Sequence, residues 1–196
     1  AEEKGAYRRM KREAFLGLWP LKYHRERWTL VRLRLEPGKL ASARAATGPT
    51  DADYAQHVME LKKRLRAKLA GKVFHIAVQK PFVVVGDEDA DTVRARSVRT
   101  VKWASDMLKA DYFPKDPNGT YDVFLFKNRE SYTAGARGLF GDRPSTPFGY
   151  CSSHNKALVM NIATGGGTLV HEMVHSFMGS NFPACPSWFN EGLASL

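Results

Sequence analysis

The chain has 196 residues, of which 43% are hydrophobic and 26% are charged, values typical of a folded globular protein and not of a disordered one. No apolar run approaches the roughly 20 residues that cross a bilayer, which excludes a transmembrane segment. Two cysteines are too few for a disulfide scaffold, and no CxxC pair indicates a structural zinc site.

The net charge of +10 is unevenly distributed. Residues 1–72 contain 18 basic and 8 acidic side chains, whereas residues 73–196 contain 12 of each. We therefore expect a basic N-terminal region over 1–72 and a separate globular domain over 73–196. The chain carries no helix-turn-helix, zinc-finger or RNA-recognition signature, so we expect the basic face to be solvated and to bind no specific nucleic acid.

The N-terminal region contains one predicted strand and one predicted helix. Residues 29–35 alternate in polarity, which is typical of a half-buried strand. A helix is predicted over 52–70, with Thr50 or Asp51 as its N-cap and a stripe of leucines on one side. Its other faces carry Lys62, Lys63, Arg64, Arg66 and Lys68. Such a helix can contact a membrane or a nucleic acid, but we expect it to be a surface helix that docks through its leucines.

Strands and helices alternate in the rest of the chain. The expected strands are 74–78, 82–85, 121–126, 148–152 and 157–161. In the strand over 121–126, we expect Val123 and Leu125 on one face and Phe124 and Phe126 on the other. The expected helices are 91–110, 129–137, 168–178 and one that begins near 186. The helix over 91–110 is expected to turn Val98, Val101, Met107 and Leu108 inward. This order predicts an α+β fold in which residues 73–162 form a mixed or mostly antiparallel sheet.

The segment from His171 to His175 reads H-E-x-x-H. Residues four apart on a helix lie about 40° apart around its axis, so both imidazoles project from the same face. Two ring nitrogens placed in this way can bind one Zn²⁺ at about 2.0–2.1 Å. Glu172 then lies beside the metal, where its carboxylate can take a proton from a zinc-bound water.

A catalytic zinc requires a third protein ligand and keeps a fourth position for water. Glu191 is the only acidic residue after His175. A proline-containing loop separates the two and allows a second helix, starting near Pro186, to fold back. We therefore expect Glu191 to be able to reach the metal.

The H-E-x-x-H motif, followed by W-F-N-E-G-L-A at residues 188–194, resembles the gluzincin zinc metallopeptidases and their peptidase MA-like group. The resemblance covers about residues 145–196 and implies a zincin-like fold that cleaves a peptide or protein substrate. It implies that His171, His175 and Glu191 bind Zn²⁺ and that Glu172 is the general base. The 15 residues between His175 and Glu191 are fewer than in the related aminopeptidases, so their exopeptidase specificity is not transferred.

The resemblance also implies a docking strand for the substrate. It places Ala157, Leu158, Val159, Met160 and Asn161 at the open edge of the sheet, beside the metal, where an extended peptide would add a strand. Gly165–Gly167 then lies near the cleft or forms a plain strand-to-helix turn.

Further expectations concern the cysteines, the C-terminal end and the alternative function. Cys151 and Cys185 form one disulfide or remain two buried thiols, and a secreted or periplasmic location is favoured. Further protein is expected after Leu196, since the family has a C-terminal subdomain there. The alternative function is a catalytically silent, metal-stabilised binding or scaffold module, against which the intact Glu172 argues.

Overall fold

The computed structural model describes residues 21–24, 27–30 and 48–195. The chain divides into two compact units, the first ending at Thr47 and the second beginning at Gly48. In the first unit, β1 (Leu21–His24) and β2 (Arg27–Leu30) form an antiparallel pair in which Leu21 lies opposite Leu30. The strand predicted over 29–35 overlaps β2 at its first two residues, and its remainder lies outside the described residues.

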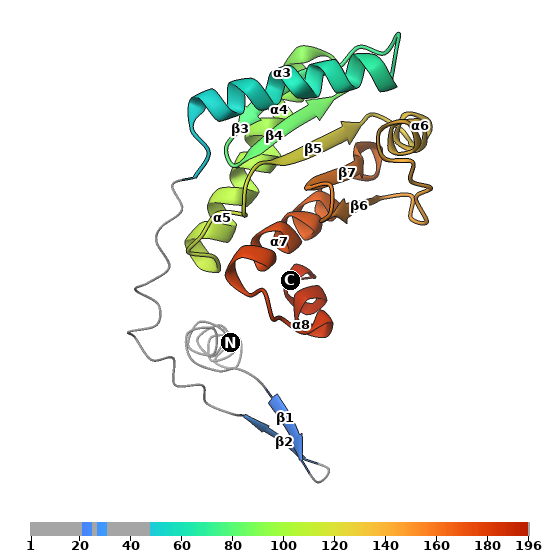
Figure 1. Ribbon diagram of the computed structural model, residues 1–196. Helices are drawn as coiled ribbons and strands as arrows, with labels where there is room; N and C mark the ends of the chain where they lie inside the picture. The colour runs from blue at the N-terminus through green and yellow to red at the C-terminus, as the bar shows by residue number, and fades with distance from the viewer. Residues whose placement is uncertain (1–20, 25–26, 31–47, 196) are drawn as a thin grey trace. The chain divides into compact units, whose positions relative to one another are not determined.

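A mixed five-stranded sheet forms the centre of the second unit (Figure 1). Its order is β3 (His75–Gln79), β4 (Phe82–Gly86), β5 (Tyr121–Phe126), β7 (Ala157–Asn161) and β6 (Gly149–Ser152). The strands β4, β5 and β7 are parallel, whereas β3 and β6 pair antiparallel at the two edges. The expected α+β class with a mixed sheet is therefore confirmed.

Helices cover both faces of this sheet (Figure 1). They are α3 (Asp51–Lys68), α4 (Ala90–Arg96), the π-helix η1 (Ser97–Lys102), α5 (Trp103–Asp111), α6 (Arg129–Phe140), the short 3-10 helix η2 (Ile162–Thr164), α7 (Gly167–Asn181) and α8 (Ser187–Ala194). Within the described residues, no helix combines the length and the hydropathy needed to cross a bilayer.

The alternation of side chains along the strands builds two cores. On β5, Val123 and Leu125 pack with α4, η1, α5 and α7, whereas Phe124 and Phe126 pack with α3 and α6. This is the division that the pattern of residues 121–126 predicts, because successive side chains of a strand point to opposite faces. The metal-motif helix α7 is thus fixed against the sheet through one of these cores.

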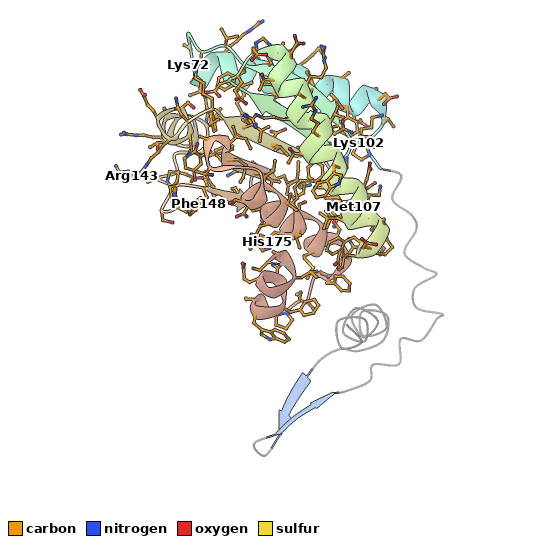
Figure 2. All side chains as sticks on the ribbon, turned by 180° about the vertical axis from the view of Figure 1, so that it is seen from behind. Lys72, Lys102, Met107, Arg143, Phe148 and His175 are labelled. Carbon is orange, nitrogen blue, oxygen red and sulfur yellow. The ribbon has the colours of Figure 1, made fainter. Side chains whose placement is uncertain are left out.

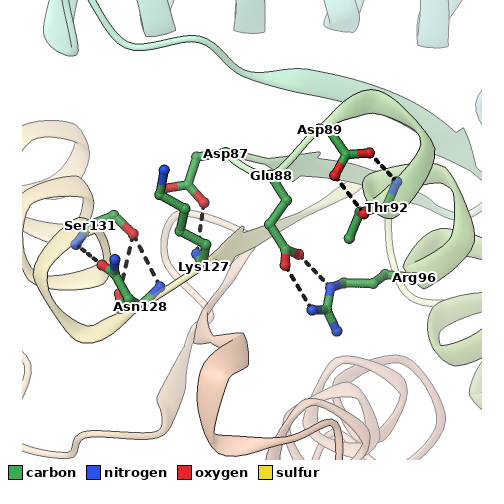
Figure 3. Close-up of polar contacts among 8 residues, drawn as sticks. All are labelled: Asp87, Glu88, Asp89, Thr92, Arg96, Lys127, Asn128 and Ser131. Carbon is green, nitrogen blue, oxygen red and sulfur yellow. Dashed lines mark hydrogen bonds and ion pairs between the residues drawn. The ribbon is translucent and has the colours of Figure 1, made fainter.

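Side-chain caps fix where the helices begin. Thr50 is the N-cap of α3 and forms a capping box with Asp53, as one of the two sequence-based alternatives expected. Figure 3 shows the equivalent contacts at the carboxyl ends of β4 and β5, where Asp89 accepts hydrogen bonds from Thr92 and where Asn128 caps α6. These caps satisfy backbone groups that the first helical turn leaves unpaired.

The helix predicted over 91–110 is interrupted by η1. Val101 and Leu108 are buried as expected, but Val98 is 50% exposed and Met107 is 44% exposed. Val98 and Met107 are nine residues apart, which at 100° per residue places them about 180° apart around a helix, so they cannot both join the face that buries Val101 and Leu108. The expectation that Val98 and Met107 face inward was wrong for this reason.

The helix α3 belongs with the sheet and not with a separate N-terminal region of residues 1–72. Tyr54, Leu61 and Leu65 are buried in the core that α3 shares with β4, β5, β7 and α6. Not all of its basic residues are solvated, because Arg64 pairs with Asp122 and Lys68 donates to the carbonyl oxygen of Leu139. The described compact unit therefore starts at Gly48.

The predicted substrate-docking strand lies inside the sheet. β7 (Ala157–Asn161) pairs with β5 on one side and with β6 on the other, and all five of its residues are buried. The expectation that Ala157, Leu158, Val159, Met160 and Asn161 form an open edge was therefore wrong. The preceding strand β6 turns back antiparallel and occupies the edge, so its outer side pairs with no other strand of the described residues.

Candidate metal site

The helix α7 presents both histidines of the motif on one side. The opposite side of α7 is buried through Leu169, Met173 and Phe177. The His171 and His175 rings are half-buried, with their centroids 4.9 Å apart and their planes at 84°. The spacing of four residues thus places the two imidazoles together, as the sequence predicts.

The return of the chain through α8 brings Glu191 to these rings. One carboxylate oxygen lies 3.4 Å from Nε2 of His171, and the other lies 3.6 Å from Nε2 of His175. All three ligand atoms lie within 4.8 Å of one another. The three residues that the sequence singles out as ligands therefore meet.

The two separations between the Glu191 oxygens and the imidazole nitrogens fit a shared cation better than they fit direct hydrogen bonds. A nitrogen–oxygen hydrogen bond has a usual length of about 2.7–3.2 Å. Two ligands of a tetrahedral ion with bonds of about 2.0–2.1 Å lie about 3.4 Å apart. The donor set of two imidazoles and one carboxylate can thus hold a small divalent cation.

Asn190 positions one of the histidines. Its side-chain oxygen Oδ1 lies 2.9 Å from Nδ1 of His175. An Nδ1–H group donating to this oxygen leaves the unprotonated Nε2 directed toward Glu191, which is the state that a metal requires. Sequence reasoning did not single out Asn190, although its place directly before Glu191 on α8 was the available signal.

Glu172 lies half-buried on α7, between the histidines in sequence and facing the edge strand β6. Burial raises the pKa of its carboxyl group, while His175, His171 and a hydrogen bond from the backbone N–H of Cys151 oppose this shift. Glu172 lines the same cavity as both histidines and Glu191. It is thus placed to exchange a proton with a molecule bound in that cavity.

The cavity over the site has a volume of about 500 Å³. Its walls come from β6, from α7, from the loop that leads into α8 and from α8 itself, and the described residues that line it include no lysine or arginine. The remaining lining residues are Tyr150, Cys151, Ser153, Met178, Gly179, Phe182, Pro183, Cys185 and Asn190. The volume and the mixed polar and apolar lining are typical of a site for a small molecule or a short peptide segment.

The two cysteines both line this cavity as free thiols. Of the two expected alternatives, the structure thus contains the thiols and not the disulfide. Burial raises the pKa of Cys151 to about 11, so its thiol stays protonated at neutral pH and is a poor metal ligand or nucleophile.

Other residues considered in the sequence lie away from the cavity. None of the residues of β7 lines it, and the neighbouring strand β6 contributes Tyr150 and Cys151 instead. His154 is exposed in the turn between β6 and β7, and Gly165–Gly167 forms the turn into α7 without lining the cavity. The site is therefore built by α7, α8 and β6.

No protein-family model, no curated protein and no solved structure matches this chain. The geometry of the site is consequently the basis on which its function is inferred.

Proposed function

We propose that the protein is a zinc-dependent peptidase with a zincin-like fold of the gluzincin type. The observation that carries this proposal is the convergence of His171, His175 and Glu191 beside the carboxylate of Glu172, with the Glu191 oxygens 3.4 Å and 3.6 Å from the two imidazole nitrogens. Two helices that are separated by a loop supply this set, in the order that the H-E-x-x-H and W-F-N-E-G-L-A motifs lead us to expect.

Each residue of the site has a distinct role in this proposal. His171, His175 and Glu191 would hold the zinc ion, which when bound supplies a Lewis acid and lowers the pKa of a coordinated water. Glu172 accepts a proton from the attacking water and later delivers it to the leaving amine. Asn190 holds His175 in the orientation in which Nε2 faces the ion.

The outer edge of β6 is the surface on which we propose that an extended peptide docks. The N–H of Asn161 donates to the carbonyl oxygen of Phe148, which directs this carbonyl toward β7. Hydrogen-bonding groups alternate in direction along an antiparallel edge strand, so the N–H and C=O groups of Gly149 and Cys151 point away from β7. The N–H of Cys151 donates to Glu172, so a substrate strand would pair with the N–H and C=O of Gly149 and with the C=O of Cys151, and would pass the cavity in which Glu172 lies.

The test combines metal analysis with a peptide-library cleavage assay on the purified native full-length protein. We expect one bound zinc in the wild type and in Glu172→Gln, and a loss of cleavage of roughly 10²–10⁴-fold in Glu172→Gln, since the amide cannot accept a proton. Glu130→Gln is the matched control, because Glu130 is an exposed glutamate on α6. It should leave both zinc content and cleavage unchanged.

Three outcomes contradict parts of the proposal. Unchanged turnover in Glu172→Gln would show that the assignment of the general base is wrong. Bound zinc without cleavage of any peptide by the native protein would support the alternative of a silent, metal-stabilised scaffold. Failure to bind zinc in the wild type would exclude both functions.

A further inference from the structure

The outer side of α3 carries basic residues that the proposed function does not use. The chain contains no acidic residue between Glu60 and Asp87, and in this stretch it has seven basic ones. Three of them are engaged: Arg64 with Asp122, Lys68 with a backbone carbonyl and Lys80 with Asp51. The other four are Lys62, Lys63, Arg66 and Lys72.

These four side chains are exposed, and the described part of the chain offers none of them an acidic partner within ion-pair distance. Three of them lie on the last turns of α3. Lys72 follows in the loop after the helix and is labelled near the upper end of the second compact unit in Figure 2. Several other cations on this unit's helices do have a carboxylate partner, among them Arg96 with Glu88, Lys102 with Asp106 and Lys109 with Asp116. The positive charge at the end of α3 is therefore not neutralised locally.

The cations surround an aliphatic floor. Met59, Lys62, Lys63, Arg66 and Ala67 line a shallow hollow of about 530 Å³, which we call the α3 patch. Their spacing of three and four residues places them on one side of the helix. The buried Leu61 and Leu65 lie toward the sheet, so the α3 patch faces away from the core. Met59 is 65% exposed, and Val73 beyond the helix is 70% exposed.

The chemistry of the α3 patch suits a surface of negative charges over an apolar layer. The patch contains no aromatic ring on which a base can stack. Lysine and arginine near an anionic membrane each gain attraction to its headgroups, and an exposed methionine can enter the boundary between headgroups and acyl chains.

We propose that the α3 patch docks the protein reversibly on an anionic lipid surface. The helix lies along the membrane, with its cations at the headgroups and its leucines still in the protein core. Each cation contributes about a fivefold change in affinity, which follows from about 1 kcal/mol per lysine or arginine. Neutralising Lys62, Lys63 and Arg66 together should thus weaken binding by about 100-fold.

The experiment measures co-sedimentation of the full chain with vesicles of phosphatidylcholine alone and of phosphatidylcholine with one-fifth phosphatidylglycerol. The test variant is Lys62→Gln, Lys63→Gln, Arg66→Gln. The matched control is Arg99→Gln, Lys115→Gln, Arg143→Gln, which removes the same net charge from exposed cations on other elements. We expect binding to the anionic vesicles only, about a 100-fold loss in the test variant and a much smaller loss in the control.

Two further measurements sharpen the result. Raising the ionic strength from about 0.05 M to about 0.3 M should weaken binding strongly, since screening shortens the reach of the charges. Met59→Ser should weaken vesicle binding by several-fold at constant charge. Both triple variants should keep the thermal unfolding midpoint of the wild type, because every substituted side chain is exposed.

The proposal fails if the two triple variants lose binding equally, because net charge alone would then explain it. It fails if the test variant binds as the wild type does, which would place lipid binding elsewhere in the chain. It also fails if the wild type binds double-stranded DNA more tightly than anionic vesicles in the same buffer and the test variant loses that DNA binding.

Discussion

Two clusters in this protein each join basic side chains from helices to one carboxylate, and they differ in the distances between the groups. Between α3 and β5, both oxygens of Asp122 are occupied, by His57 at 2.6 Å and by Arg64 at 2.7 Å. Between α7 and α8, the oxygens of Glu191 lie 3.4 Å and 3.6 Å from the two histidines. The first cluster is a closed set of hydrogen bonds, and the second leaves room for a cation.

The two carboxylates also differ in how far they are exposed to solvent. The Asp122 side chain is 4% exposed, whereas that of Glu191 is 62% exposed. A buried carboxylate must be paired within the protein, because its desolvation costs several kcal/mol. Glu191 is exposed and therefore does not need a partner within the protein, yet its carboxylate points at two histidines. The comparison teaches that residue types alone do not separate a structural ion pair such as that of Asp122 from the proposed metal site at Glu191, whereas the separation of the groups and their exposure distinguish the two clusters.

The largest expected effect is on the free energy of unfolding of the metal-free protein, which should depend on the carboxylate of one cluster and not on that of the other. Asp122→Asn should lower the free energy of unfolding by about 2–3 kcal/mol, because it leaves Arg64 and His57 near a neutral amide. Glu191→Gln should change it by less than about 0.5 kcal/mol, since this side chain is exposed and makes no short hydrogen bond. Urea unfolding in the presence of a chelator measures both. Equal destabilisation by the two substitutions would remove the distinction between the clusters.

A smaller effect is expected on zinc affinity, and it should arise only from the cluster between α7 and α8. Asn190→Ala should weaken zinc binding by roughly 10–100-fold, because His175 loses the partner that fixes its ring. Competition with a chromogenic chelator measures the affinity. Asn118→Ala, in an exposed turn, is the control and should leave it unchanged. If Asn190→Ala binds zinc as tightly as the wild type, Asn190 does not position the ligand.

The smallest expected effect is a pH dependence confined to the cluster between α3 and β5. The hydrogen bond to Asp122 raises the pKa of His57, and Glu60 adds to this shift while burial and Arg64 oppose it. A raised pKa means that protonated His57 stabilises the fold fully below its unfolded value of about 6.5 and loses this contribution as pH rises through the folded value. The free energy of unfolding, compared with that of His57→Gln from pH 5 to pH 9, should therefore differ most at low pH. A constant difference would contradict the assignment.

Much of the site could be predicted because its signals are local. The H-E-x-x-H spacing fixes the relation of His171 to His175 through the geometry of a single helix. Glu191 could be named as their partner because no other acidic residue follows His175. The cap at Thr50 and the alternation along β5 depend only on nearest neighbours in the chain, and both expectations are confirmed.

What the tertiary structure alone decided involves residues far apart in sequence. Asp122 meets His57 across 65 positions and Arg64 across 58, and no periodicity links them. The position of β7 between β5 and β6 depends on which strands pair, and alternation within a strand does not specify its neighbours. The choice of the helix face that packs on the sheet leaves Val98 and Met107 exposed beside the buried Val101 and Leu108. The sequence by itself thus determined which side chains share a local face, and long-range packing determined which of those faces meet.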